Sequence, residues 1–348
     1  MCFSLLFIYT LTEANRKADD PLKKNSNIGI DGMNFELTLN IDNSNIPLIE
    51  RNLLNEEGII YASVKIQYNK IYLYCNLPKR IRRDNVLPFS YIDMKHLAEA
   101  KKSIIADLQS VVDSYNLDCD VKESIVKKIE CNITIKVNKD TTCGQVMNMF
   151  NRFYHKGRNI VYQDPSIECK FLKDDVTVLP IVGREKYYTV KIYNKSIEQM
   201  NKGNIEVESD LLRFELIAVN RTLKKICFKD LSIDNVLSIE ILSAVIEEFK
   251  EIMNNRILKD IRTCLNELTE IIFQSLIITN SPLKTIAINK ELIVDVEILE
   301  KAMIMWYRKK GSSFDRAKNN TSKFISENKQ LNLPRGVIAT IRKLKKYV

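Results

Sequence analysis

Histidine, glycine and proline are all scarce in this sequence of 348 residues. The two histidines, His96 and His155, and eight cysteines that never fall in C-x-x-C spacing exclude the common zinc-binding patterns. The P-loop, the Rossmann glycine pattern and a Ser-His-Asp arrangement are also missing, which excludes the enzyme classes that depend on them. With nine glycines, eight prolines and 45% apolar residues, the composition is that of a folded protein rather than a disordered one.

The cysteines also bear on the cellular compartment. Their spacing forms no disulfide framework in a chain of this length, and we therefore expect a reducing cytoplasm. The same length supports a sizeable hydrophobic core and predicts two domains.

Positive charge is concentrated at the C-terminus. The net charge is +9, yet residues 306–348 hold twelve Lys or Arg against two acids, so the remaining residues sum to about −1. A basic block on a near-neutral body favours contact with a polyanion. Nucleic acid ranks above a merely solvated helical surface, and an anionic membrane ranks below both.

The N-terminus begins with a short apolar run over residues 2–11. It is too short to span a bilayer and lacks the basic flank of a signal sequence. We interpret residues 1–32 as a polar leader that lies outside the true reading frame, with the start at Met33. Mass spectrometry of the native N-terminus tests this, and a peptide from residues 2–30 would contradict it.

Hydrophobic periodicity predicts an α+β fold with a largely antiparallel sheet and packed helices. Two-residue alternation predicts strands, and helical spacing predicts helices over 91–115 and 142–154. After residue 230 the spacing is helical almost to the end. The expected domains are an α+β body over 33–230 and a helical, basic part over 231–348. The predicted strands are 34–41, 59–68, 70–76, 124–137, 160–162, 168–172, 176–179, 187–193 and 211–219, and the predicted C-terminal helices are 235–277 (broken once), 291–310, 313–327 and 334–347.

Tyr193 and Lys195 lie at the end of a predicted strand, two residues apart. A tyrosine there is most often a packing residue with its hydroxyl in solvent. It could alternatively attack a phosphodiester and form a covalent intermediate, with the lysine stabilising charge on the phosphate. Spacing alone favours packing.

Three carboxylates, Glu130, Glu198 and Glu215, accompany predicted strands. Such residues usually pair with a cross-strand cation such as Arg213 or Lys128. They could alternatively bind Mg²⁺ or Mn²⁺, hard ions that prefer oxygen ligands and bridge to phosphate. Taken alone, the salt-bridge interpretation is the stronger.

Two basic segments are candidate DNA-binding surfaces. Guanidinium groups bind backbone phosphates bidentately, and a solvated loop is an equally good interpretation of the first segment. The candidates are Lys79, Arg80, Arg82 and Arg83 in the first segment, and Arg308, Lys309 and Lys310 in the tail.

Several short motifs occur in a characteristic order along residues 34–230. They are Tyr74-Cys75-Asn76-Leu77-Pro78-Lys79 followed by Asn85, a long helix from 91, Lys128-Ile129-Glu130-Cys131-Asn132, Lys191-Ile192-Tyr193-Asn194-Lys195 with Glu198, Leu212-Arg213-Phe214-Glu215-Leu216, and Thr222-Leu223-Lys224. This arrangement resembles the replication initiators of filamentous phages and related phage and plasmid rolling-circle systems. Glu at 130 and Lys at 128 depart from the family, which usually has Asp and Arg there.

The resemblance implies a rolling-circle fold and a site-specific endonuclease that nicks and rejoins one DNA strand. It implies Tyr193 as nucleophile through a phosphotyrosyl intermediate, with Lys195 as its cationic partner. Glu130, Glu198 and Glu215 would bind Mg²⁺ or Mn²⁺, and Arg213 would orient a carboxylate or bind DNA. The implied partners are a phage or plasmid origin and a host helicase.

Two other interpretations remain open. The first is a non-catalytic DNA-binding protein of a prophage or plasmid, which binds DNA in a salt-sensitive way and never nicks it. The second is a structural or membrane-surface protein that uses the N-terminal apolar run. Fractionation that recovered all of the full-length protein as soluble would count against the second.

Overall fold

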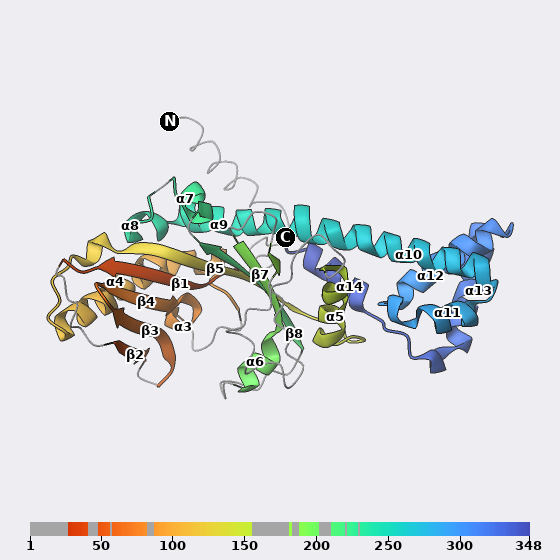
Figure 1. Cartoon of the computed structure of the whole chain (residues 1–348), viewed down its shortest axis with the longest axis horizontal. Helices are drawn as coiled ribbons and strands as arrows, with labels where there is room; N and C mark the ends of the chain where they lie inside the picture. Colours follow the sequence, from red (N-terminus) through yellow and green to blue (C-terminus); the bar gives the residue numbers. More distant parts are fainter. Residues whose placement is uncertain are drawn as a thin grey trace.

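A computed structural model gives the fold of the chain (Figure 1). Its described part contains one eight-stranded sheet in the order β2-β3-β4-β1-β5-β8-β7-β6, with every neighbouring pair antiparallel. Together with the packed helices, this sheet confirms the α+β prediction. The residues that the structure describes are 27–40, 48–55, 58–81, 87–154, 181–182, 188–201, 210–219, 221–228 and 230–348. The strands are β1 (Ile28–Thr38), β2 (Ile49–Leu54), β3 (Ile60–Gln67), β4 (Lys70–Asn76), β5 (Ile125–Lys136), β6 (Ile181–Val182), β7 (Tyr188–Asn194) and β8 (Leu211–Val219).

The central strands separate polar from apolar side chains on the two faces of the sheet. Successive side chains of a strand point to opposite faces, so cross-strand partners share a face. The register pairs Glu130 with Gly32 and Ile217, Asn132 with Glu215, and Tyr193 with Arg213. One face is therefore polar over β1, β5, β7 and β8, and we call it the polar face.

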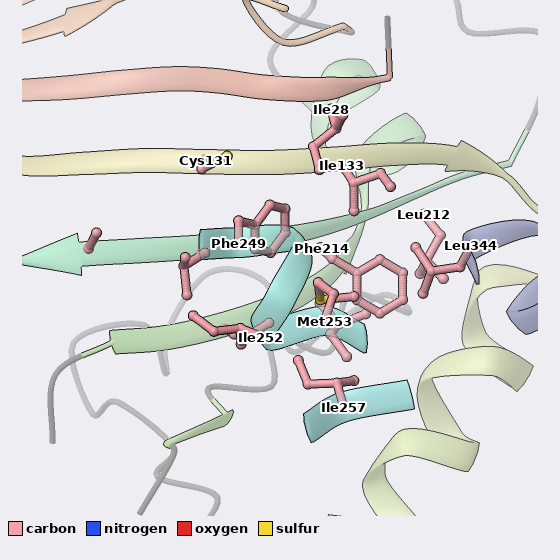
Figure 2. Close-up of a cluster of buried hydrophobic side chains, with 14 of the residues drawn as sticks. Ile28, Cys131, Ile133, Leu212, Phe214, Phe249, Ile252, Met253, Ile257 and Leu344 are labelled. Atoms are coloured by element: carbon pink, nitrogen blue, oxygen red, sulfur yellow. The ribbon is translucent and has the colours of Figure 1, made fainter. Parts of the chain in front are cut away.

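The other face forms the hydrophobic core. Figure 2 shows Phe249 and Met253 packed among side chains of the sheet that include Ile133 and Phe214. Phe249 belongs to α9 (Ile239–Ile252), which is followed by a π-helical segment, η3 (Met253–Leu258), and by α10 (Lys259–Thr279). A π turn inserts one residue per turn and so redirects the apolar side chains. The helix predicted over 235–277 is interrupted near its start, at Leu237 and Ser238 between α8 (Ile233–Val236) and α9, whereas η3 continues the helix without a gap.

The C-terminal helices do not all lie apart from the sheet. In Figure 1, α11 to α13 gather at the end of α10 away from the sheet, whereas α14 (Val337–Lys345) lies near α5 (Cys143–Tyr154). The Asn138 amide donates to the Thr340 hydroxyl at 2.9 Å, and Lys343 donates to the Lys136 carbonyl at 3.0 Å. The boundary expected at residue 231 stays a prediction, but α9 and α14 pack directly on the sheet.

Some elements differ from the prediction in where they begin or in their type. β1 begins at Ile28, inside the leader predicted over 1–32, and Ile28 and Ile30 are fully buried. The basic segment at 77–81 is a short helix rather than a loop, and a further helix starts at Lys195, where the strand ends. The strands predicted at 160–162, 168–172 and 176–179 lie outside the described residues. The remaining elements are α3 (Leu77–Ile81), η1 (Tyr91–His96), α4 (Leu97–Ser114), η2 (Val121–Glu123), α6 (Lys195–Asn201), α7 (Arg221–Ile226), α8 (Ile233–Val236), α11 (Pro282–Asn289), η4 (Lys290–Leu292), α12 (Val296–Lys309), α13 (Phe314–Glu327) and η5 (Lys329–Leu331).

Among the described helices, none combines the length and the apolar character that crossing a bilayer requires.

Candidate functional site

Three buried carboxylates meet on the polar face. Asp31 comes from β1, Glu130 from β5 and Glu215 from β8, and each offers an oxygen within 4.8 Å of the other two. We call these residues the carboxylate trio. Three acids from three adjacent strands converge here although they are separated by long stretches of sequence.

An irregularity in β1 brings Asp31 to the trio. The pairing of β1 with β5 shifts between Ile30 and Gly32, so Asp31 is the extra residue of a β-bulge. Its carboxylate accepts hydrogen bonds from Asn76 at 3.3 Å and from Arg213 at 3.1 Å. A bulge redirects one side chain, and here it turns an acid towards the polar face.

Gly32 makes room beside the trio. A Cβ atom at this position would lie 2.6 Å from the Tyr74 hydroxyl and 2.8 Å from Oε2 of Glu130. Both distances are shorter than real Cβ contacts allow. Glycine therefore permits the close approach of Tyr74 and Glu130.

Three cations offset the charge of the trio. Arg213 is fully buried and pairs with Asp31, and its Nε atom donates to the Thr134 hydroxyl at 2.9 Å. Lys128 pairs with Glu130, and Lys191 lies 3.8 Å from Glu215. Buried charges persist only when they are paired in this way.

Two tyrosines contact the trio from either side. Tyr193 of β7 donates to Glu215 at 3.1 Å, and Tyr74 of β4 donates to Glu130 at 3.0 Å. Burial, and then the neighbouring carboxylate, raise the pKa of both phenols well above 10. Tyr74 and Tyr193 are only partly exposed as residues, and burial is the main cause of both shifts.

The pKa of Glu215 is raised by its surroundings. Burial, and then the charges of Glu130 and Asp31, raise its pKa to about 7, although Lys191 and Arg213 oppose the shift. A divalent cation would relieve this repulsion, and carboxylate oxygens are the ligands that Mg²⁺ and Mn²⁺ prefer. The donor set therefore fits the metal ions expected from the sequence.

Comparisons with known proteins add little to this geometry. No family model matches the chain, and no curated protein matches it. Among solved structures, the rolling circle replication initiator protein from Geobacillus stearothermophilus is similar over 57% of this chain and 76% of that chain, at 9% identity and a TM-score of 0.27. So low a likeness carries no argument, and function has to be argued from the site.

Lys195 and Glu198 form a pair of their own. Lys195 opens α6 with a fully buried side chain, and its Nζ atom lies 2.5 Å from Oε2 of Glu198. Burial, and then the charge of Arg213, lower the pKa of Lys195 to about 8, while Glu198 opposes this. Glu198 was expected beside Glu130 and Glu215, but the third acid of the trio is Asp31.

Two arginines expected to bind DNA are buried instead. The Arg80 side chain is only 3% exposed and pairs with Asp107 of α4, and its Nε atom donates to Cys75. Arg213 is 0% exposed and orients Asp31. Their assignment to DNA phosphates is corrected, because both guanidinium groups point into the protein.

The other predicted DNA contacts have different locations. Lys79 is half-buried and donates to the Ile60 carbonyl at 3.3 Å. The tail cluster, defined as Arg308, Lys309 and Lys310, is exposed at the end of α12, far along α10 from the sheet in Figure 1. Arg82 and Arg83 lie outside the described residues.

Sequence reasoning missed Asp31 as a site residue because it lay within the assumed leader. The alternation of Ile28 and Ile30 before it was the available signal of a strand that starts early. Tyr74 and Asn132 belonged to recognised motifs, but no local pattern marked them as site residues.

Proposed function

We propose that this protein is a rolling-circle replication initiator, a site-specific endonuclease and ligase of single DNA strands with Tyr193 as nucleophile. The observation that carries the proposal is the hydrogen bond from the Tyr193 hydroxyl to Glu215 within the carboxylate trio. A phenol that already donates to a carboxylate is an arrangement suited to general-base activation.

The proposed reaction is a transesterification. The Tyr193 oxygen attacks the phosphorus of a DNA phosphodiester and forms a phosphotyrosyl bond to the 5′ end. The bond from phosphorus to the 3′ oxygen breaks, and that oxygen leaves as a hydroxyl after taking up a proton. Glu215 accepts the tyrosine proton through the existing hydrogen bond. Joining reverses these steps, with a free 3′ hydroxyl as the attacking group.

Asp31, Glu130 and Glu215 would hold Mg²⁺ or Mn²⁺. When bound, the cation would polarise the phosphate and offset the charge that develops on it. Arg213 keeps Asp31 oriented, and Lys195 is proposed to add positive charge at the same edge of the sheet.

The partners follow from this chemistry and from the charge distribution. The tail cluster would contact the DNA backbone beyond the nicking site, since exposed Lys and Arg neutralise phosphates without reading sequence. The origin of a phage or plasmid, a host helicase and a cytoplasmic location complete the proposal.

A second candidate is a non-catalytic DNA-binding protein. The observation that favours it is that each acid of the trio already pairs with a cation, namely Arg213, Lys128 or Lys191. Such pairs can stabilise a sheet without any metal ion. This protein would bind DNA and leave it intact.

Covalent adduct formation tests the proposal. The full-length protein is incubated with a supercoiled plasmid that carries the DNA flanking its own gene, in Mg²⁺ or Mn²⁺, and adducts are separated under denaturing conditions. Tyr193→Phe should abolish both nick and adduct, because it removes the attacking oxygen and little else. Tyr74→Phe is the matched control, since it removes the other phenol that contacts the trio, and it should retain the adduct.

Two results would decide against parts of this proposal. Adduct formation by the Tyr193→Phe variant would remove Tyr193 from the mechanism. Salt-sensitive DNA binding by the wild-type protein, with no nick in either metal, would favour the non-catalytic candidate.

A further inference from the structure

Asn132 is an unusual residue of the polar face. Its side chain is fully buried, and neither its amide oxygen nor its amide nitrogen has a hydrogen-bond partner among the residues that the structure describes. A buried amide without partners destabilises the folded state, because its N–H and C=O groups lose the hydrogen bonds that water gives them in the unfolded chain. A buried polar side chain that lacks a partner in the protein indicates that a bound ion, water or ligand supplies one.

The sheet places Asn132 against the carboxylate trio. On β5 it lies two residues from both Glu130 and Thr134, and it pairs across the sheet with Glu215 on β8 and Gly29 on β1. Directly opposed residues have Cβ atoms about 4.5–5.5 Å apart. The amide therefore lies between two of the three acids, on the same face.

The neighbouring groups are already engaged with other partners. Glu130 accepts from Tyr74, Glu215 accepts from Tyr193, and the Thr134 hydroxyl accepts from Arg213. None of these three interactions includes the amide of Asn132. A cation that contacts both the trio and Asn132 would satisfy the amide oxygen.

We propose that the amide oxygen of Asn132 is a fourth protein ligand of a divalent cation held by Asp31, Glu130 and Glu215. This inference rests on the metal site of the proposed function. Hard cations accept amide carbonyl oxygens together with carboxylates. No donor in the described part of the chain contacts the amide oxygen of Asn132, and a bound cation would give this oxygen a partner.

A neutral ligand suits this position. Three carboxylates whose oxygens lie within 4.8 Å of one another already repel one another in the metal-free protein. A fourth acid at residue 132 would add to that repulsion in the metal-free protein. Asparagine supplies an oxygen without a charge, and so it extends the coordination shell while adding no further repulsion.

Titration of Mn²⁺ into the metal-free, full-length protein tests this ligand without any DNA. Asn132→Leu replaces the amide with an apolar side chain of similar size and should weaken binding about tenfold or more, since even outer-sphere partners are worth 10–100-fold. The melting temperature of the metal-free variant should stay equal or rise, because a buried unsatisfied amide has been removed. Asn132→Asp keeps an oxygen at this position, and at pH 8 it should bind Mn²⁺ more tightly than Asn132→Leu does.

Asn34→Leu is the matched control. Asn34 lies on β1, and its amide oxygen is also buried and has no hydrogen-bond partner in the described part of the chain. Its cross-strand partners are Tyr74 and Lys128 rather than an acid of the trio. Mn²⁺ affinity should therefore be unchanged in this variant.

Three results would overturn the assignment. These are a wild-type affinity in Asn132→Leu, an equal loss in Asn34→Leu, and an absence of Mn²⁺ binding by the wild-type protein. Failure of the nuclease proposal would look different. A wild-type protein that binds Mn²⁺ through Asn132 but never nicks DNA would remove the endonuclease activity and leave the ligand assignment intact.

Discussion

At Glu215, burial and like charge act in the same direction. The side chain is buried beside Glu130 and Asp31, and its ordinary pKa of 4.5 rises to about 7. The folded state therefore binds a proton more readily than the unfolded chain does. The stability associated with this proton is fully present below pH 4.5 and is lost as the pH rises through about 7.

Glu215→Gln should remove this pH dependence. A shift from 4.5 to about 7 corresponds to about 3 kcal/mol at 1.36 kcal/mol per pH unit. In the absence of metal, the wild-type protein should lose stability between pH 5 and pH 8 relative to the variant, because glutamine has no charge to bury. Urea unfolding in EDTA at the two pH values measures the difference, and parallel losses in both proteins would contradict the assignment.

At the scale of elements, Arg80 joins α3 to α4. Its guanidinium group pairs with Asp107, donates to Ser103 at 2.7 Å and lies over the ring of Tyr61. The run of basic residues around it had predicted a phosphate-binding loop. The Arg80 side chain is instead buried between α4 and Tyr61 of β3, where it stabilises the packing of the helix on the sheet.

Asp107→Ala should destabilise the protein by about 3–5 kcal/mol, because it leaves the buried Arg80 charge without its partner. Asp113→Ala, on the exposed surface of the same helix, should have little effect. Urea denaturation of both variants provides the comparison. A small loss in Asp107→Ala would mean that the other partners of Arg80 compensate for the missing carboxylate.

At the scale of the whole molecule, the tail cluster and the carboxylate trio lie apart. The tail cluster is exposed at the end of α12, whereas the trio lies within the sheet (Figure 1). DNA that is nicked at Tyr193 and contacted by the tail cluster would have to run alongside α10. Substitutions in the tail cluster would then change DNA affinity without altering the residues that cleave the DNA.

Replacing Arg308, Lys309 and Lys310 together with Gln should weaken DNA binding and reduce its salt dependence. Each lost phosphate contact lowers the slope of log K against log salt by about 0.9 in magnitude. Fluorescence anisotropy at several salt concentrations measures the slope. Gln at Lys95, Lys102 and Lys122, which are exposed near the sheet, is the control and should leave the slope closer to that of the wild type.

Periodicity along the chain was sufficient to predict much of the sheet and most helices. Alternation over 124–137 and 211–219 correctly placed Glu130 and Glu215 on polar sides of their strands. The helical spacing after residue 230 predicted one break within 235–277, and the structure places a break at Leu237 and Ser238, between α8 and α9. These features depend on neighbours a few residues apart, and such neighbours can be read from a single sequence.

Contacts between distant segments required the tertiary structure. The bulge that turns Asp31 towards Arg213, the pairing of Asn132 with Glu215 and the burial of Arg80 against Asp107 all depend on strand register or helix packing. Register is set by how two strands align in space, and a slip of one residue moves a side chain to the opposite face. Sequence alone thus determined which residues share a strand face, and the fold decided which of them meet.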